Sequence, residues 1–252
     1  MITFVILFVA AFCAGIQNAL AGGGSFLTFP ALMFTGLDAR AANITSTVAL
    51  FPGQVTTGLA GRKNVSDLPQ LSFKALFVIS LIGGVLGAIL LLVTPVSVFE
   101  FLVPWLVLFA TCVFVWGSFF RKVQENSKPI GPIGAIGSQF LISIYGGYFG
   151  GGIGILMLAA LTIAGLDVRK AGATKNVLAG VMNASAVLIF LFSKDVAWTQ
   201  VLVASIASIA GGQVGAFALK RVNERLLRIC IIILGFGLAI GLFMKAHGGS
   251  GI

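Results

Sequence analysis

Residues 22–40 read GGGSFLTFPALMFTGLDAR, and residues 150–169 read the related segment GGGIGILMLAALTIAGLDVR. Each segment begins with a glycine triplet, continues through an apolar stretch and closes on a GLDxR motif. The two copies are 128 residues apart at the triplets and 129 residues apart at the GLDxR motifs, so one insertion separates them. Two triplets that lead to the same motif at matched spacing indicate an internal repeat.

The repeat continues beyond the motifs. Thr45 aligns with Thr174, Ser46 with Lys175 and Thr47 with Asn176. The halves differ where a serine in the first stands against a lysine in the second. If both halves bound a ligand in the same way, this difference would make their roles unequal.

The composition is that of a membrane protein. Of the 252 residues, 58% are hydrophobic and 9% are charged, whereas a soluble domain carries about 25% charged residues. This excludes a cytosolic enzyme, a secreted disulfide scaffold and a disordered protein. The net charge of +9 comes from scattered basic residues that form no patch, so it favours orientation in a membrane over binding of nucleic acid.

The chain divides into eight stretches without Asp, Glu, Lys or Arg. They are 1–37, 41–61, 75–99, 101–120, 129–166, 176–193, 196–219 and 229–244. A membrane helix needs about 20 apolar residues, so six stretches fit one helix each. The first and fifth are nearly twice as long, and each contains a glycine triplet that should break the helix. Each long stretch therefore predicts a helix, a break and a shorter second arm, at about 25–36 and 153–164.

The basic residues predict how the long stretches cross the membrane. If each crosses once, Lys and Arg divide evenly between the two sides. If each crosses and returns, 13 of the 16 fall on one side, leaving Arg40, Lys194 and Lys245 on the other. Cytoplasmic loops concentrate Lys and Arg, so the second arrangement is favoured. It gives an odd number of segments in each half, which makes the repeats inverted.

The predicted fold is an all-α polytopic membrane protein with eight to ten membrane segments. Each inverted repeat contains a glycine-interrupted helix pair and three spanning helices. The first repeat covers 1–120, a polar cytoplasmic linker covers 121–130 and the second repeat covers 131–252. Both termini and the GLDAR motif are expected outside, and the GLDVR motif in the cytoplasm. Paired, interrupted helices in inverted repeats indicate a secondary transporter with its site at the repeat interface.

The two breaks are the predicted substrate site. A helix that begins after a glycine triplet presents free N–H groups and the positive end of its dipole, which suit an anion. The candidate binding residues are Gln17, Asn18, Gly22, Gly23, Gly24, Ser25, Asn43, Thr45, Tyr148, Gly150, Gly151, Gly152, Thr174, Lys175 and Asn176. The alternative interpretation is that the triplets only permit close helix packing.

The charged residues near the repeats have two interpretations each. Asp38 and Asp167 precede helices, where aspartate caps free N–H groups; they could also be ligands or gating groups. Arg40 and Arg169 would be interface anchors or partners of these aspartates. Lys175 lies about two turns into its helix, where it would either offset the charge of an anion or snorkel to the cytoplasmic interface.

Several chemistries have no motif in this chain. There is no H-E-x-x-H, G-x-S-x-G or Walker sequence, so an enzyme is not expected, and neither is a cofactor. Cys13, Cys112 and Cys230 lie far apart in apolar stretches, so buried structural cysteines are expected and no metal site. The expected partners are a small anionic substrate and the lipid bilayer, with a coupling ion and the oligomeric state left open.

The two repeated segments, together with the Ala-Thr-Lys-Asn sequence at residues 173–176, resemble the duplicated signature of the TauE/SafE family of sulfite exporters and membrane transporters. The resemblance covers essentially the whole chain. It implies a permease of the prokaryotic cell membrane that exports sulfite or a related small sulfur-containing anion by alternating access. A carrier for another small solute or a cation, and a non-transporting membrane subunit, remain as alternatives.

Overall fold

The computed structural model describes residues 2–20, 23–117, 130–218 and 224–248, and these residues are almost entirely helical. Its helices are α1 Ile2–Leu20, α2 Ser25–Phe34, α3 Ala39–Gly61, η1 Arg62–Asn64, α4 Phe73–Val93, α5 Val96–Val115, α6 Pro132–Tyr148, α7 Ile153–Ile163, α8 Val168–Phe190, α9 Trp198–Ala218 and α10 Glu224–Gly248. Within the described ranges there is no β-strand, which confirms the predicted all-α class. Gly22 and most of the predicted linker 121–130 lie outside these ranges.

Both predicted helix breaks are present. The gap between α1 and α2 falls on the first glycine triplet, and the gap between α6 and α7 falls on the second. Gly23 has a φ of +91°, and Gly150 and Gly152 have φ values of +76° and +70°. Residues with a Cβ rarely adopt this left-handed backbone. The triplets are therefore what allows the chain to turn between the paired helices.

The second arm of each pair is short. α2 has 10 residues and α7 has 11, which at 1.5 Å per residue gives lengths of about 15 Å and about 17 Å. Either is roughly half of the hydrocarbon thickness of a bilayer, about 30 Å. Both arms are followed by a long helix of 23 residues, α3 after α2 and α8 after α7. The two interrupted pairs thus have the same design.

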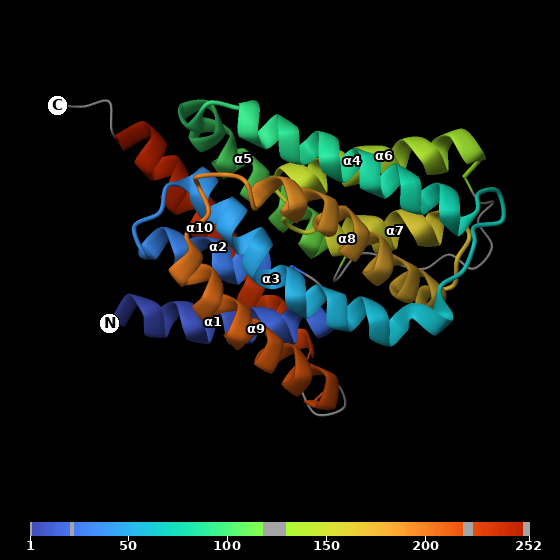
Figure 1. Ribbon diagram of the computed structural model, residues 1–252, viewed down its shortest axis with the longest axis horizontal. Helices are drawn as coiled ribbons and strands as arrows, with labels where there is room; N and C mark the ends of the chain where they lie inside the picture. The colour runs from blue at the N-terminus through green and yellow to red at the C-terminus, as the bar shows by residue number, and fades with distance from the viewer. Residues whose placement is uncertain (1, 21–22, 118–129, 219–223, 249–252) are drawn as a thin grey trace.

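The helices pack as two groups that exchange a helix between the sequence halves. α9 from the second half packs with α1 and α3 of the first half, and α2 packs on α1 and α3; α4 from the first half packs with α6 and α8 of the second half, and α7 packs on α6 and α8 (Figure 1). We call these the first bundle (α1, α2, α3, α9) and the second bundle (α4, α6, α7, α8). Glycines allow the close contacts: a Cβ at Gly15 would collide with the Ser208 carbonyl, and one at Gly87 with that of Ile144.

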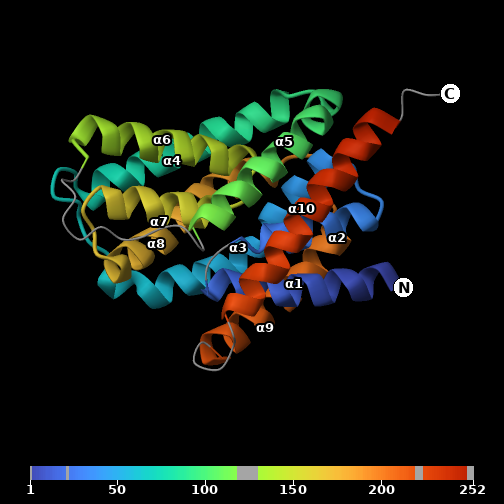
Figure 2. The ribbon, with the colours of Figure 1, turned by 180° about the vertical axis from the view of Figure 1, so that it is seen from behind.

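The remaining two helices, α5 and α10, pack against each other and cross the molecule side by side (Figure 2). α3 and α8, one from each bundle, pack together in the middle of the molecule. They run in opposite directions, so that α3 begins at the end of the molecule where α1 begins, and α8 begins at the opposite end (Figure 1). We call these the Arg40 end and the Arg169 end.

The outer surfaces suit lipid. Among the described helices, α4, α5 and α8 are long and apolar enough to cross a membrane, and exposed leucine, isoleucine and phenylalanine side chains cover α4 and α5. Cys112 on α5 is exposed and Cys13 is half-buried. The expectation of buried cysteines was therefore wrong for Cys112, because an apolar thiol is as compatible with a lipid-facing position as with a core.

Candidate functional site

A cavity lies between the two glycine breaks, where the two bundles meet. Its volume is about 70 Å³, which is room for a few water molecules or one small anion. The lining residues are Asn18, Gly23, Ser25, Ser46, Thr47, Leu50, Gln54, Phe149, Gly150, Ile153, Gly154, Lys175, Asn176, Ala179 and Asn183. They come from both breaks, from the starts of α2 and α7 and from α3 and α8. The cavity is therefore built from equivalent parts of the two sequence halves.

Six of the predicted binding residues line this cavity: Asn18, Gly23, Ser25, Gly150, Lys175 and Asn176. In the first break, the Asn18 side-chain oxygen accepts a hydrogen bond from the Gly24 N–H at 2.8 Å. This bond fixes the Asn18 side chain and the start of α2 against α1. Ser25 and Ile153, the first residues of α2 and α7, both border the cavity. Both dipoles thus present their positive ends to the site.

Among the described residues that line the cavity, Lys175 is the only charged one. It is 8% exposed, and among the described residues it forms no ion pair and no side-chain hydrogen bond. Ser46, its counterpart in the first half, instead has its hydroxyl 2.6 Å from that of Thr28 on α2. A buried ammonium without a partner is costly in a membrane protein. The cavity therefore favours a ligand with negative charge.

The polar pair Gln54 and Asn183 completes the cavity. The Asn183 amide donates a hydrogen bond to the Gln54 side-chain oxygen at 2.5 Å, which joins α3 to α8. Sequence analysis did not include these two residues in the site, and it also left out Ser46, Thr47 and Gly154. The signal that could have found the pair is their separation of 129 residues, which equals the offset of the GLDxR motifs.

Four other predicted binding residues hold segments together outside this cavity. The Asn43 side chain donates to the Tyr148 carbonyl at 3.0 Å, and the Tyr148 ring packs edge-to-face on Phe99. The Thr45 hydroxyl accepts from the Ala197 N–H at 3.1 Å, and the Thr174 hydroxyl accepts from the Ser66 N–H at 3.2 Å. The two threonines thus make matching contacts, each with the loop that precedes a long helix.

The remaining glycines of the triplets are packed closely. A Cβ at Gly24 would collide with the Ala14 carbonyl of α1, and the Gly152 backbone lies against the Ala110 carbonyl of α5. The Tyr145 hydroxyl donates to the Gly151 carbonyl at 2.9 Å. Gln17 is fully buried but does not line the cavity. Close packing and the cavity thus occur together at the triplets, with Gly23 and Gly150 facing the cavity.

The aspartates of the GLDxR motifs lie at helix starts and do not line the cavity. Asp38 caps α3 by accepting from the Arg40 and Ala41 N–H groups at 2.9 Å and 3.0 Å. Asp167 caps α8 by accepting from the Lys170 N–H at 2.9 Å, and this hydrogen bond lowers the pKa of the Asp167 carboxyl.

The two arginines of the motifs differ. Arg40 forms an ion pair of 2.9 Å with Asp195, whereas Arg169 is exposed and has no carboxylate partner among the described residues.

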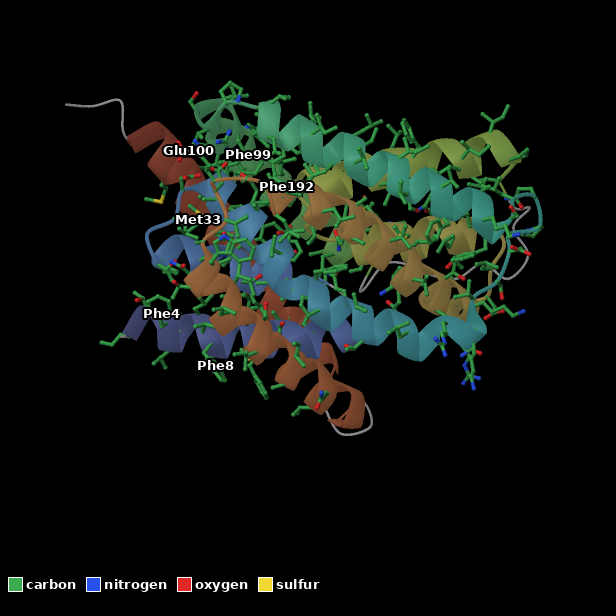
Figure 3. All side chains as sticks on the ribbon, in the orientation of Figure 1. Phe4, Phe8, Met33, Phe99, Glu100 and Phe192 are labelled. Carbon is green, nitrogen blue, oxygen red and sulfur yellow. The ribbon has the colours of Figure 1, made fainter. Side chains whose placement is uncertain are left out.

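A second cavity, of about 260 Å³, lies at the Arg40 end. Met33, Phe101, Leu242 and the carboxylate of Glu100 line it, and Met33 and Glu100 are seen at that end in Figure 3. Its walls are largely apolar and its one charged group is acidic, so it does not suit an anion. No cluster of His, Cys, Asp or Glu able to hold a metal ion occurs in the part of the chain that the structure describes.

Comparison with known proteins identifies the family. The family described as "Sulfite exporter TauE/SafE" matches residues 7–242, nearly the whole chain. The chain belongs to the TauE/SafE family. Its relatives include a Sinorhizobium protein named "Probable membrane transporter protein ORF9", which is 31% identical over 94% of this chain and 90% of its own. No solved structure matches the chain significantly.

Two further relatives carry similar names. A Haemophilus influenzae "Probable membrane transporter protein" is 31% identical over 92% of this chain and 91% of its own. The Escherichia coli K12 "Probable membrane transporter protein YfcA" is 26% identical over 96% of this chain and 90% of its own. Family membership and these names support a multi-pass membrane transporter with a small solute as substrate, and a transporter rather than an enzyme.

Proposed function

We propose that this TauE/SafE member is a secondary carrier that exports sulfite or a related small sulfur-containing anion by alternating access. The observation that carries the proposal is the chemistry of the cavity between the breaks. Its described lining carries serine and threonine hydroxyls, side-chain amides and the Lys175 ammonium beside the first residues of α2 and α7, and it includes no carboxylate. Such donors bind an oxyanion, and the cavity of about 70 Å³ limits the ligand to a small one.

The packing supports the proposed inverted repeat. The contact of α1 with α9 has its counterpart in the contact of α6 with α4, and the contact of α3 with α9 in that of α8 with α4. At the centre, Gln54 and Asn183 are one repeat apart and hydrogen-bonded to each other. Equivalent residues that meet on antiparallel helices are expected beside a two-fold axis in the membrane plane. The cavity borders this pair, as expected for a transporter site.

The helix exchange suggests which parts move. Because α4 packs with the second bundle and α9 with the first, the two bundles, rather than residues 1–120 and 131–252, are the units that would rock against each other. The cavity lies between α3 of one bundle and α8 of the other. A relative tilt of the bundles would open it first toward one side of the membrane and then toward the other.

Ligand-induced thermal stabilisation tests the proposal. Purified protein is heated with sulfite, thiosulfate, sulfate, sulfoacetate, taurine or a panel of cations. A ligand at 100 times its dissociation constant adds about 2.7 kcal/mol to the free energy of unfolding. We expect stabilisation by sulfur oxyanions, weakened at least about tenfold in affinity by Lys175→Gln, because a hydrogen bond to a charged group contributes about 1.5–3 kcal/mol.

The matched control is Lys170→Gln, which removes an exposed lysine of the same helix and should leave affinity unchanged. Stabilisation by cations or neutral solutes alone would overturn the anion proposal and favour another carrier in the same fold. Stabilisation by no solute, together with a stable protein partner on purification, would favour a non-transporting subunit.

A further inference from the structure

Arg40 joins three segments at the Arg40 end of the molecule. Its guanidinium forms the ion pair with Asp195, at 2.9 Å, and donates to the Thr94 carbonyl at 3.0 Å. Both ionic side chains are partly covered, with exposed fractions of 18% for Arg40 and 26% for Asp195. Two residues labelled in Figure 3 mark this end of the molecule. Phe99 follows Thr94 in the chain, and Phe192 precedes Asp195.

These contacts connect the two bundles. Arg40 belongs to α3 of the first bundle, and Thr94 follows α4 of the second bundle. Asp195 lies in the loop between α8 and α9, and the Thr45 hydroxyl of α3 holds this loop to the first bundle through the Ala197 N–H. The contact that crosses from one bundle to the other is the hydrogen bond from the Arg40 guanidinium to the Thr94 carbonyl, and the ion pair with Asp195 orients the guanidinium for it. When the bundles separate at this end, the hydrogen bond to Thr94 must break.

The Arg169 end has the same framework without the acidic partner. There the Ser66 N–H donates to Thr174, as the Ala197 N–H donates to Thr45. Asp195 lies two residues before Ala197, and Asn64 lies two residues before Ser66, so these two residues occupy matched positions. The loop at the Arg169 end thus carries a neutral residue at the matched position.

The nearest carboxylate in that loop, that of Asp67, instead accepts a hydrogen bond from the Phe73 N–H at 2.6 Å. It caps the start of α4, and no ion pair joins it to Arg169 in the described part of the chain.

The starts of α3 and α8 also differ in burial, and the start of α3 is the more buried of the two. Ala39 at the start of α3 is 3% exposed, and Val168, its counterpart at the start of α8, is 49% exposed. Arg169 is exposed as well. The start of α3 is therefore more covered by neighbouring segments than the start of α8, although the two sequences follow the same motif.

We propose that Arg40 and Asp195 form a latch that keeps the cavity closed toward the Arg40 end, and that Asn64 in place of an acid leaves the Arg169 end without one. The resting carrier then faces the Arg169 end. This inference rests on the proposed function, because a latch requires a cavity that opens to each side in turn. With the Arg40 end outside, the latch favours loading from the cytoplasm, which is the direction of an exporter.

Chemical labelling of the cavity from each side tests the latch. Thr47→Cys places a thiol on the cavity lining in a chain whose three native cysteines are replaced by alanine. A membrane-impermeant thiol reagent is applied to right-side-out and to inverted vesicles. Labelling is expected from the side of the Arg169 end. Asp195→Asn should raise the labelling rate from the Arg40 side by about fivefold, the population shift for loss of an ion pair of about 1 kcal/mol.

A second variant adds a latch instead of removing one. Asn64→Asp places a carboxylate at the position matched to Asp195, and it should slow labelling from the Arg169 side and speed labelling from the Arg40 side. Asn64 is exposed, so this change leaves the core intact. Lys194→Gln, an exposed neighbour of the latch, is the control and should change neither rate, and Asp195→Glu should retain the native pattern.

The outcomes separate the latch from the proposed function. Unchanged labelling in both Asp195→Asn and Asn64→Asp would overturn the latch, whereas sulfite stabilisation of the purified variants would still support the carrier. Equal effects of Asp195→Asn and Lys194→Gln would also overturn it, since a general change of surface charge would then suffice. A thiol at position 47 that is labelled from neither side would contradict the cavity, and with it both proposals.

Discussion

At the scale of single residues, the two halves differ most clearly at Ser46 and Lys175. The Ser46 hydroxyl pairs with that of Thr28, whereas the Lys175 ammonium has no ion-pair or hydrogen-bond partner among the described residues. The two halves therefore share the same helical framework, but only the second half has a lysine at this position. A single fixed cation beside neutral donors offsets part of an anion's charge without the strong attraction that would impede release.

Charge at position 175 should matter more than shape. Lys175→Arg keeps the charge and should retain anion-induced stabilisation within about tenfold in affinity, whereas Lys175→Met should lose it, because an unpaired buried anion is costly. The measurement is a titration of thermal stability with sulfite. Equal affinity in Lys175→Met and the native protein would show that the ammonium does not contact the ligand.

The Gln54–Asn183 hydrogen bond should stabilise the folded protein. Asn183→Leu leaves the half-buried Gln54 amide without its partner and should cost about 1–3 kcal/mol in the free energy of unfolding. Replacing both residues by leucine should cost less than the single change, since no polar group is then stranded. Thermal unfolding of the single and double variants measures this, and a double variant that loses the sum of both single changes would contradict it.

At the scale of elements, the local features were predictable from sequence because local chemistry sets them. Glycine triplets break helices, and the structure places both breaks on them. Aspartates before helices cap free N–H groups, and Asp38 and Asp167 have that geometry. The cavity lining was harder to predict, because Thr45 and Thr174 resemble Thr47 in sequence but face loops instead. Which face of a long helix meets which neighbour depends on packing between distant segments.

The second break should be sensitive at Gly152. This residue has a φ of +70° and lies against the Ala110 carbonyl, so Gly152→Ala should lower the free energy of unfolding by about 1–2 kcal/mol. Gly172→Ala is the control: that position is helical with open space around it, and alanine there should be neutral or stabilising by up to about 1 kcal/mol. Similar melting temperatures for the two variants would contradict the strained turn.

At the scale of the whole molecule, the helix exchange was not predictable from a single sequence. Hydropathy and charge indicate how many segments cross and in which direction, but not that α4 leaves its own half to pack against α6 and α8. The exchange also makes each bundle depend on both halves.

We therefore expect that two halves expressed separately will not fold alone. Co-expression should restore a complex that co-purifies and binds sulfite. A stable, monodisperse first half, residues 1–120, would contradict the exchange.

Sulfite transport in proteoliposomes decides whether this protein is a sulfite carrier. Purified protein is reconstituted, vesicles are loaded with sulfite, and efflux is followed against empty liposomes, Lys175→Gln and the control Lys170→Gln. We predict saturable efflux that thiosulfate or sulfoacetate inhibits. Lys170→Gln should retain this efflux, and Lys175→Gln should reduce it at least about tenfold. Efflux equal to that of empty liposomes, from protein that binds none of these anions, would contradict it.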